Sequence, residues 1–196
     1  NCNLSKIDMV RIAVNIQNYK TAKILAITLK NLGYKIGFNL MQSHGQSESF
    51  YFKVAKDIFS WKIVDVLYYA DSLGCMEPDE IQFVSKNLLR GWKSKLGVHT
   101  HNNKNLALIN TLTAISNHVT FCDSTILGMG RGAGNLSTES LITEASYKEY
   151  HDGSTQSLTK TMEDFKKLKS ELHWGPNYFY HFAANNNIHP TYVQKI

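Results

Sequence analysis

The sequence contains no long apolar run, and no stretch approaches the roughly 20 residues that a helix needs to cross a bilayer. It also has no cluster of lysine or arginine and no basic stripe interleaved with aromatic residues, although its formal net charge is +5. These absences argue against a membrane protein and against a nucleic-acid partner. Only three cysteines occur, Cys2, Cys75 and Cys122, and none forms a C-x-x-C pair. They favour a reduced, cytoplasmic protein over a disulfide framework.

Short apolar segments alternate with helical patterns along the first 150 residues. The segments at 9–14, 34–41, 63–70, 95–98 and 119–123 are expected to be strands, with helical patterns between them. The strand starts recur about every 25 to 30 residues, which is typical of parallel βαβ units in an α/β protein. Two architectures fit this pattern, an open doubly wound sheet and part of a (β/α)8 barrel.

The first predicted strand is followed by a predicted helix with a recognisable start and end. The run at 9–14 is almost continuously apolar, so we expect this strand to be buried on both faces. Asn18 is the expected N-cap of a helix with an apolar side over residues 22–32, and Gly33 ends that helix.

The pattern changes near residue 150. A polar, helix-like stretch follows at 158–172, and then an aromatic-rich tail at 174–192. We therefore expect a domain over residues 1–150 and a helical C-terminal appendage over residues 151–196.

Polar residues collect where the predicted strands end. His99 and His101 are two residues apart, so on a strand both imidazoles project from the same side. Because neutral imidazoles are common ligands of divalent metals, the pair suggests half of a metal site. The alternative is that the two histidines only form hydrogen bonds at the end of the strand. The other strands are followed by Asn39, Gln42, Asp71, Ser72, Asp123 and Ser124. In both architectures such strand ends share one rim, which suggests a single pocket.

Several segments occur in an order and at a spacing that resemble a known family. They are MVRIAV at 9–14, GFNLMQSH at 37–44, YADS at 69–72, GVHTHNN at 97–103, DST at 123–125 and GMGRGAGN at 128–135, followed by Thr138 and Glu139. They resemble the metal-dependent 4-hydroxy-2-oxovalerate aldolases, in the superfamily of barrel metallolyases that includes hydroxymethylglutaryl-CoA lyase. The tail follows these aldolases only loosely. It looks more similar to aldolase-like proteins of surface-polysaccharide pathways.

The resemblance implies a partial (β/α)8 TIM barrel in which this chain supplies about strands four to eight. The family's first strand carries an aspartate metal ligand, with an arginine and a catalytic base close by, and no matching Arg-Asp-Gly occurs here. The chain also begins with Asn rather than Met. We therefore expect the C-terminal part of a longer enzyme, or a truncated form, that is inactive by itself.

The resemblance also implies a metal site. His99 and His101 match two ligands of Mn²⁺ or Mg²⁺. In the lyase relatives the residue that matches Asn135 completes the metal sphere, and a helix N-cap or a loop-stabilising role is an equal alternative for it. The glycines before Asn135 suit a tight loop that approaches the substrate, and a phosphate cradle is the rival interpretation.

Three further residues are implied to contact the substrate. Ser72 matches a serine that hydrogen-bonds the substrate's carboxylate or carbonyl, and a turn-forming pair with Asp71 is the alternative. Phe38 matches a pocket-lining phenylalanine, and a core position fits equally well. Arg131, a catalytic candidate, stands where these aldolases have a small residue. It either contacts an additional anionic group or points to solvent.

The tail has two interpretations. The family aldolases place a tyrosine from this region near the active site, and either Tyr178 or Tyr180 fits that role. An aromatic interaction surface is the alternative. The known aldolases work with an acylating aldehyde dehydrogenase. The divergent tail leaves that partner open, and the sequence leaves a homo-oligomer open as well.

The resemblance implies an aldolase that needs a divalent metal. It would cleave or form a C–C bond of a 4-hydroxy-2-oxoacid, through a pyruvate enolate and with an aldehyde product. The second hypothesis is a Claisen-type lyase or synthase acting on an acyl-CoA thioester. The third is a catalytically degenerate barrel used for binding or assembly.

Overall fold

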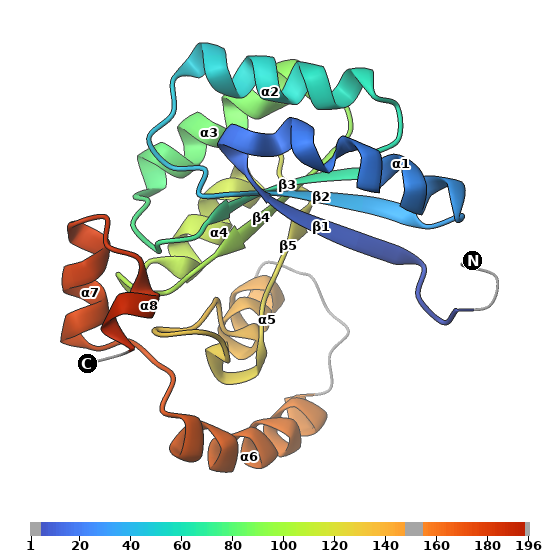
Figure 1. Cartoon of the computed structure of the whole chain (residues 1–196). Helices are drawn as coiled ribbons and strands as arrows, with labels where there is room; N and C mark the ends of the chain where they lie inside the picture. Colours follow the sequence, from blue (N-terminus) through green and yellow to red (C-terminus); the bar gives the residue numbers. More distant parts are fainter. Residues whose placement is uncertain (1–4, 148–154, 195–196) are drawn as a thin grey trace.

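The computed structural model describes residues 5–147 and 155–194, and within them five parallel strands form one sheet (Figure 1). The strands are β1 (Met9–Asn15), β2 (Lys35–Met41), β3 (Val66–Asp71), β4 (Lys95–Thr100) and β5 (Phe121–Cys122). Their order in the sheet is their order along the chain. A doubly wound sheet reverses at a switch point, whereas a barrel adds each strand beside the last. The observed order is therefore that of a barrel segment.

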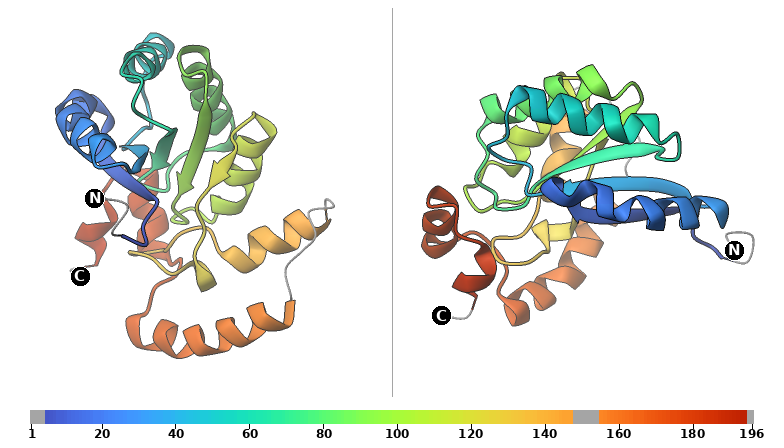
Figure 2. Two further views of the ribbon diagram at one scale, coloured as in Figure 1. Left: turned by 90° about the vertical axis from the view of Figure 1, so that its right-hand side faces the viewer. Right: turned by 45° about the horizontal axis from the view of Figure 1, so that its top comes forward.

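Helical segments connect the strands, as the alternating pattern predicts. They are η2 (Ile16–Ala22), α1 (Lys23–Asn31), α2 (Glu48–Ser60), α3 (Pro78–Gly91) and α4 (Ala107–Ser116). After β5 follow η3 (Ile126–Gly128), α5 (Thr138–Tyr147), α6 (Thr155–Leu172), α7 (Tyr178–Asn185) and α8 (Pro190–Val193). Helices α1 to α4 line the outer side of the sheet (Figure 2). Ser47 caps α2 by accepting a hydrogen bond from the Phe50 N–H, and Pro78 opens α3.

The hydrophobic core lies between the sheet and these outer helices. Strand residues that point outward, such as Ile36, Leu40 and Leu67, are fully buried, and so are Tyr51 and Ile58 on α2. Burying an aliphatic or aromatic side chain of this size contributes about 1.5–3 kcal/mol. Because apolar residues take the outward positions, the alternate, inward positions of the strands are free to carry polar side chains.

Two local predictions at the start of the chain are wrong. Strand β1 is not buried on both faces: Ile12 is its only buried residue, since among the described residues β1 pairs with β2 alone. Asn18 does not cap a helix. Instead the Asn15 side chain accepts a hydrogen bond from the Gln17 N–H and starts the 3-10 segment η2, so the α-helix begins only at Lys23.

The inner side of the sheet is filled around Tyr68. The guanidinium carbon of Arg11 lies 4.8 Å from the centroid of the Tyr68 ring, and the Phe121 ring meets the same ring edge-on at 6.2 Å. The Tyr68 ring lies over Gly97, where an added Cβ would come within 2.3 Å of Tyr68 Cε1. Glycine at this position therefore lets the ring extend across the neighbouring strand.

The C-terminal segment packs against the loop that follows β5. The Trp174 indole donates a hydrogen bond of 2.9 Å to the carbonyl of Leu127, and the Gly175 N–H donates one of 3.1 Å to the carbonyl of Gly132. The predicted domain boundary at residue 150 lies outside the described residues. No helix in the described ranges has the length and apolar character needed to span a membrane.

Candidate active site

The two histidines of the GVHTHNN segment lie together on the inner side of the sheet. His99 is an inward-pointing residue of β4, and His101 follows that strand, where its backbone forms a bridge with Asn135. The ring centroids of the two histidines are 5.0 Å apart and the ring planes meet at 80°. Strand alternation brings both imidazoles to one side, and both line the same cavity.

A carboxylate holds the first histidine. Asp123, just after β5, has its Oδ2 atom 2.8 Å from His99 Nδ1 and 2.5 Å from Arg11 Nη1. Burial favours the neutral acid, but the hydrogen bond from His99 and the charge of Arg11 outweigh it and lower the pKa of Asp123. Because a carboxylate only accepts, His99 carries its proton on Nδ1, which leaves the lone pair of Nε2 free.

The second histidine is neutral and has an unpaired nitrogen. Burial, with added repulsion from His99 and Arg131, lowers the pKa of His101 to about 3, and its buried Nδ1 has no hydrogen-bond partner among the described residues. Asn135 donates from Nδ2 to the carbonyl of Met129, while its buried Oδ1 has no partner in the described chain. Unpartnered buried polar atoms are uncommon in folded proteins and call for an explanation.

These atoms fit part of a site for a divalent cation. Neutral imidazole nitrogens and an amide oxygen are suitable ligands, and the carboxylate behind His99 fixes the ring as in many metal sites. Within residues 5–147 and 155–194 no group of three or more His, Cys, Asp or Glu side chains is placed to hold a metal. His99, His101 and Asn135 would therefore supply only part of the ligands of a cation, and the other ligands would be of another kind or come from elsewhere.

The cavity at the histidines has a volume of about 310 Å³. It is lined by Asn39, Met41, Gln42, Ala70, Ser72, His99, His101, Arg131 and His189. No carboxylate is among these lining residues, so the cavity suits a negatively charged small molecule. Ser72 Oγ accepts a hydrogen bond of 2.8 Å from the Gln42 N–H, which leaves the hydroxyl hydrogen of Ser72 free to donate to a ligand.

Phe38 does not line this cavity. It is fully buried in the core, where its ring meets Trp61 edge-on at a centroid distance of 5.5 Å. Phe38 alternates with Asn39 along β2, and Asn39 is the one that lines the cavity. Of the two positions that the sequence allowed for Phe38, the structure therefore has the core position.

The tail contributes a histidine rather than a tyrosine to the cavity. Tyr178 is 74% exposed, and Tyr180 is buried behind the glycine-rich loop, against Gly132. His189, just before α8, is the tail residue that lines the cavity. Sequence reasoning missed both His189 and Arg11. A charged residue within the apolar run at 9–14 was an available signal for Arg11.

Asp71 orients the loop after β3. Its Oδ1 accepts a hydrogen bond of 3.0 Å from the Cys75 N–H, and its Oδ2 accepts one of 3.3 Å from the Met76 N–H. The side chain is almost completely buried, and this burial raises the pKa of Asp71 to about 7. Asp71 is thus a loop-forming residue, and it is absent from the cavity lining.

This shift predicts a pH-dependent stability. The folded pKa of Asp71 lies above the ordinary value of 3.8, so the folded state binds the proton more tightly and loses stability as the pH rises toward 7. From pH 5.5 to pH 8 we expect the complete protein to lose about 2 kcal/mol relative to its Asp71→Asn variant, which cannot ionise there. Urea unfolding at several pH values measures this difference. A difference that does not change with pH would contradict it.

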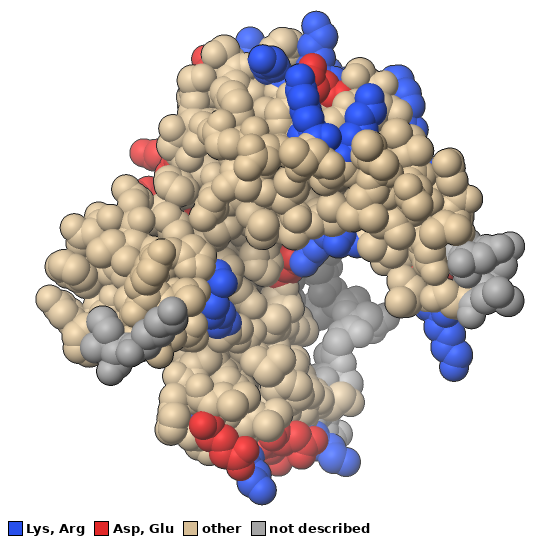
Figure 3. Space-filling model, viewed as in Figure 1, with Lys and Arg blue, Asp and Glu red and all other residues tan. Residues whose placement is uncertain are grey.

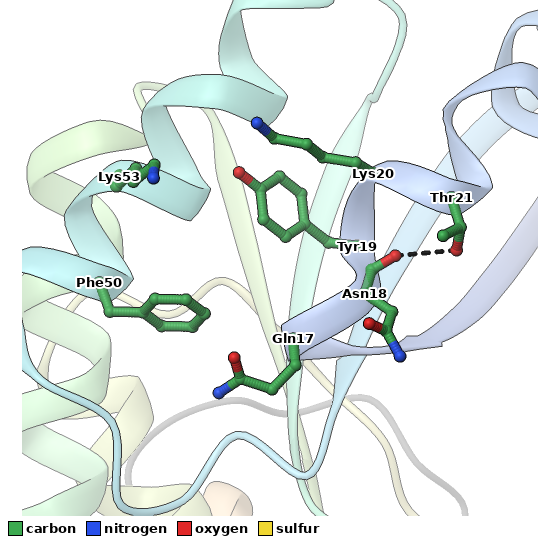
Figure 4. Close-up of a pocket in the computed structure, with 7 residues that line it drawn as sticks. All are labelled: Gln17, Asn18, Tyr19, Lys20, Thr21, Phe50 and Lys53. Atoms are coloured by element: carbon green, nitrogen blue, oxygen red, sulfur yellow. Dashed lines mark hydrogen bonds between the residues drawn. The ribbon is translucent and has the colours of Figure 1, made fainter.

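A separate hollow of about 370 Å³ lies between η2 and α2 (Figure 4). Its lining residues are Gln17, Asn18, Tyr19, Lys20, Thr21, Phe50 and Lys53. Its lining has two lysines and a tyrosine but no histidine, cysteine or carboxylate, which are the usual side-chain ligands of metals. On the face in Figure 3, basic side chains lie over α1 and α2, and both acidic and basic ones lie over α6, without a continuous basic stripe.

The fold and the cavity define a class of protein: a parallel barrel segment with a polar cavity at the carboxyl ends of its strands, where barrels carry their active sites. The chain belongs to the HMGL-like family, whose model matches residues 7–169. The resemblance to barrel lyases and aldolases that the sequence suggests is therefore confirmed.

The chain is similar in sequence to curated proteins named as aldolases. The chain is 36% identical over 137 residues to the 4-hydroxy-2-oxovalerate aldolase of Geobacillus thermodenitrificans, covering 69% of this chain and 40% of that protein. It is 33% identical over 147 residues to the 4-hydroxy-2-oxovalerate aldolase of Pelotomaculum thermopropionicum, covering 75% of this chain and 43% of that protein. The chain thus spans well under half the length of these relatives.

Solved structures share the fold. The N-terminal domain of an aldolase-like protein from Bacteroides vulgatus matches 96% of this chain, with a TM-score of 0.89 and 35% identity, over 62% of its own length. HMG-CoA lyase from Brucella melitensis matches 86% of this chain, with a TM-score of 0.74 and 15% identity, over 69% of its length. The predicted fold class, a partial TIM barrel, is confirmed.

Proposed function

We propose that the complete protein is a divalent-metal-dependent aldolase that cleaves or forms a C–C bond of a 4-hydroxy-2-oxoacid, with pyruvate and an aldehyde as the other reactants. The observation that carries the proposal is the pair His99 and His101, one fixed by Asp123 and the other neutral, at a cavity without lining carboxylates. The names of the curated relatives support the aldolase chemistry.

In this proposal His99, His101 and Asn135 hold Mn²⁺ or Mg²⁺. Bound there, the cation supplies Lewis acidity for the negative charge that develops on the substrate's carbonyl oxygen. Asp123 keeps the His99 ring in the tautomer that presents Nε2, and the low pKa of His101 keeps that ring unprotonated at neutral pH. The His101 ring is therefore available as a ligand without first losing a proton.

Ser72 and Arg131 act on the substrate. The Ser72 hydroxyl, whose oxygen already accepts from the Gln42 N–H, donates to the substrate's carboxylate or carbonyl oxygen. Arg131 adds positive charge to the cavity and attracts the anionic substrate. In this proposal His99 and His101 are both metal ligands, and no carboxylate is among the described residues that line the cavity. The base that removes the 4-hydroxyl proton is therefore assigned to a part of the barrel outside this chain.

Removal of the metal tests the proposal. Chelation of the complete protein is expected to lower pyruvate release from 4-hydroxy-2-oxovalerate at least tenfold, and added Mn²⁺ or Mg²⁺ is expected to restore it, since the cation contributes several kcal/mol to the barrier. Pyruvate formation is followed with a coupled dehydrogenase, and metal content by elemental analysis. Full turnover by protein that contains no metal would refute the mechanism.

A further inference from the structure

Two side chains from distant parts of the sequence meet at the cavity. Arg131 belongs to the glycine-rich loop, and His189 lies 58 residues later, just before α8. Tyr180 and Pro190 pack against Gly132, where an added Cβ would lie 3.1 Å from the Tyr180 ring and 3.3 Å from Pro190. The tail thus fixes the loop from behind, and it brings His189 to within 3.3 Å of the Arg131 guanidinium.

His189 faces two hydrogen-bond donors but has only one nitrogen that can accept. Its Nδ1 accepts from the Thr191 N–H at 3.4 Å and so caps α8, while its Nε2 faces Arg131 Nη2 at 3.3 Å. Burial and the charge of Arg131 lower the pKa of His189, so the ring is neutral. A neutral imidazole has one acceptor nitrogen, and both the Thr191 N–H and the guanidinium only donate. When Nδ1 caps the helix, Nε2 carries the hydrogen, and two donors face each other.

Among the described residues no protein group supplies the missing acceptor. The lining of the cavity contains no Asp or Glu, and within residues 5–147 and 155–194 Arg131 forms no ion pair with a carboxylate. An oxyanion placed between the two side chains would accept from the Arg131 guanidinium and from His189 Nε2–H together. Charge-assisted bonds of this kind are the stronger ones, and the planar guanidinium suits carboxylate and phosphate oxygens.

We propose that Arg131 and His189 form a subsite for a second anionic group on the substrate, in addition to its 2-oxoacid group. The favoured aldehyde reactant then carries a carboxylate or a phosphate, unlike acetaldehyde. The inference rests on the proposed aldolase function for its substrate. Within that function His99, His101 and Ser72 hold the 2-oxoacid group. Among the other residues that line this cavity of about 310 Å³, Arg131 is the one charged side chain, and His189 lies against it.

Aldehyde preference tests the subsite. The complete protein condenses pyruvate with propanal, with succinic semialdehyde, which carries a carboxylate, or with glyceraldehyde 3-phosphate, which carries a phosphate. We expect kcat/KM for one charged aldehyde to exceed that for propanal by about 10- to 100-fold, the value of one or two charge-assisted hydrogen bonds. Whichever charged aldehyde is favoured identifies the anion. In Arg131→Met and in His189→Leu this ratio is expected to fall toward one, whereas Arg90→Met, a surface arginine of α3, is expected to keep it.

Anion binding without turnover separates this inference from the proposed function. Titration calorimetry with succinate and with inorganic phosphate is expected to give at least tenfold weaker binding to Arg131→Met than to the parent protein. Lost binding in that variant, together with no condensation of any aldehyde by the parent, supports the subsite and overturns the aldolase proposal. Condensation without a charge preference, with equal anion binding by parent and variant, overturns the subsite and leaves the aldolase proposal standing.

Discussion

Replacement of His101 by alanine is expected to lower pyruvate release by the complete protein about a thousandfold. The side chain is a buried, neutral imidazole with an unpartnered nitrogen beside His99. In the proposed site it is one of two imidazole ligands, so its loss removes the metal and with it several kcal/mol of charge stabilisation, at about 1.4 kcal/mol per tenfold in rate. The measurements are steady-state kinetics and the molar ratio of metal to protein.

The matched control is His181→Ala, which removes an exposed histidine on α7. It is expected to change neither the rate nor the metal content. If His101→Ala keeps its metal and more than a tenth of the activity, His101 is not a ligand. A His101→Ala protein that loses activity while its circular dichroism and urea midpoint match the parent excludes unfolding as the cause.

Gly97→Ala is expected to destabilise the complete protein by about 3 kcal/mol, the upper end of the usual cost of overpacking a core. The new methyl group would lie 2.3 Å from Tyr68 Cε1 and 2.4 Å from Cδ1. The ring cannot move away easily, because Arg11 and Phe121 pack against it on the inner side of the sheet. Urea unfolding measures the loss.

Gly37→Ala, on strand β2, provides the control. There the nearest atoms to an added Cβ are Arg11 Cγ at 3.3 Å and Arg11 Cβ at 3.4 Å, a contact that a shift of a few tenths of an ångström relieves. We expect a change within about 1 kcal/mol, partly offset by the lower entropy of the unfolded chain. Equal losses in Gly97→Ala and Gly37→Ala would show that the cost is a general effect of strand glycines rather than contact with Tyr68.

Most of the fold could be predicted from the sequence because the periodicity of apolar residues is strong. Outward strand positions such as Ile36 and Leu40 are fully buried, and α3 begins with Pro78 and acidic residues in its first turn, a helix start that the sequence shows. The failures lie at β1. Burial depends on neighbouring strands, which a run of apolar residues does not reveal. Asn15 and Asn18 are both good caps, and the sequence could not distinguish them.

The site was only partly predictable. His99 and His101 could be paired because their spacing matches the strand period, which is local information. The contact of Arg11 with Asp123 joins residues 112 apart, and that of Arg131 with His189 joins residues 58 apart. Such contacts depend on the curvature of the sheet and on the path of the tail. Neither leaves a periodic trace in the sequence.

The free edge of β1 has a consequence for handling this region by itself. Over Met9–Asn15 the backbone groups on the side away from β2 have no strand partner in the described chain, and the segment contains no proline and a single charge. Natural proteins protect such edge strands with lysines, prolines or bulges, because an unprotected edge strand can pair with a strand of another molecule. Residues 5–194 by themselves are therefore expected to aggregate through β1 at high protein concentration, unless another strand pairs with this edge.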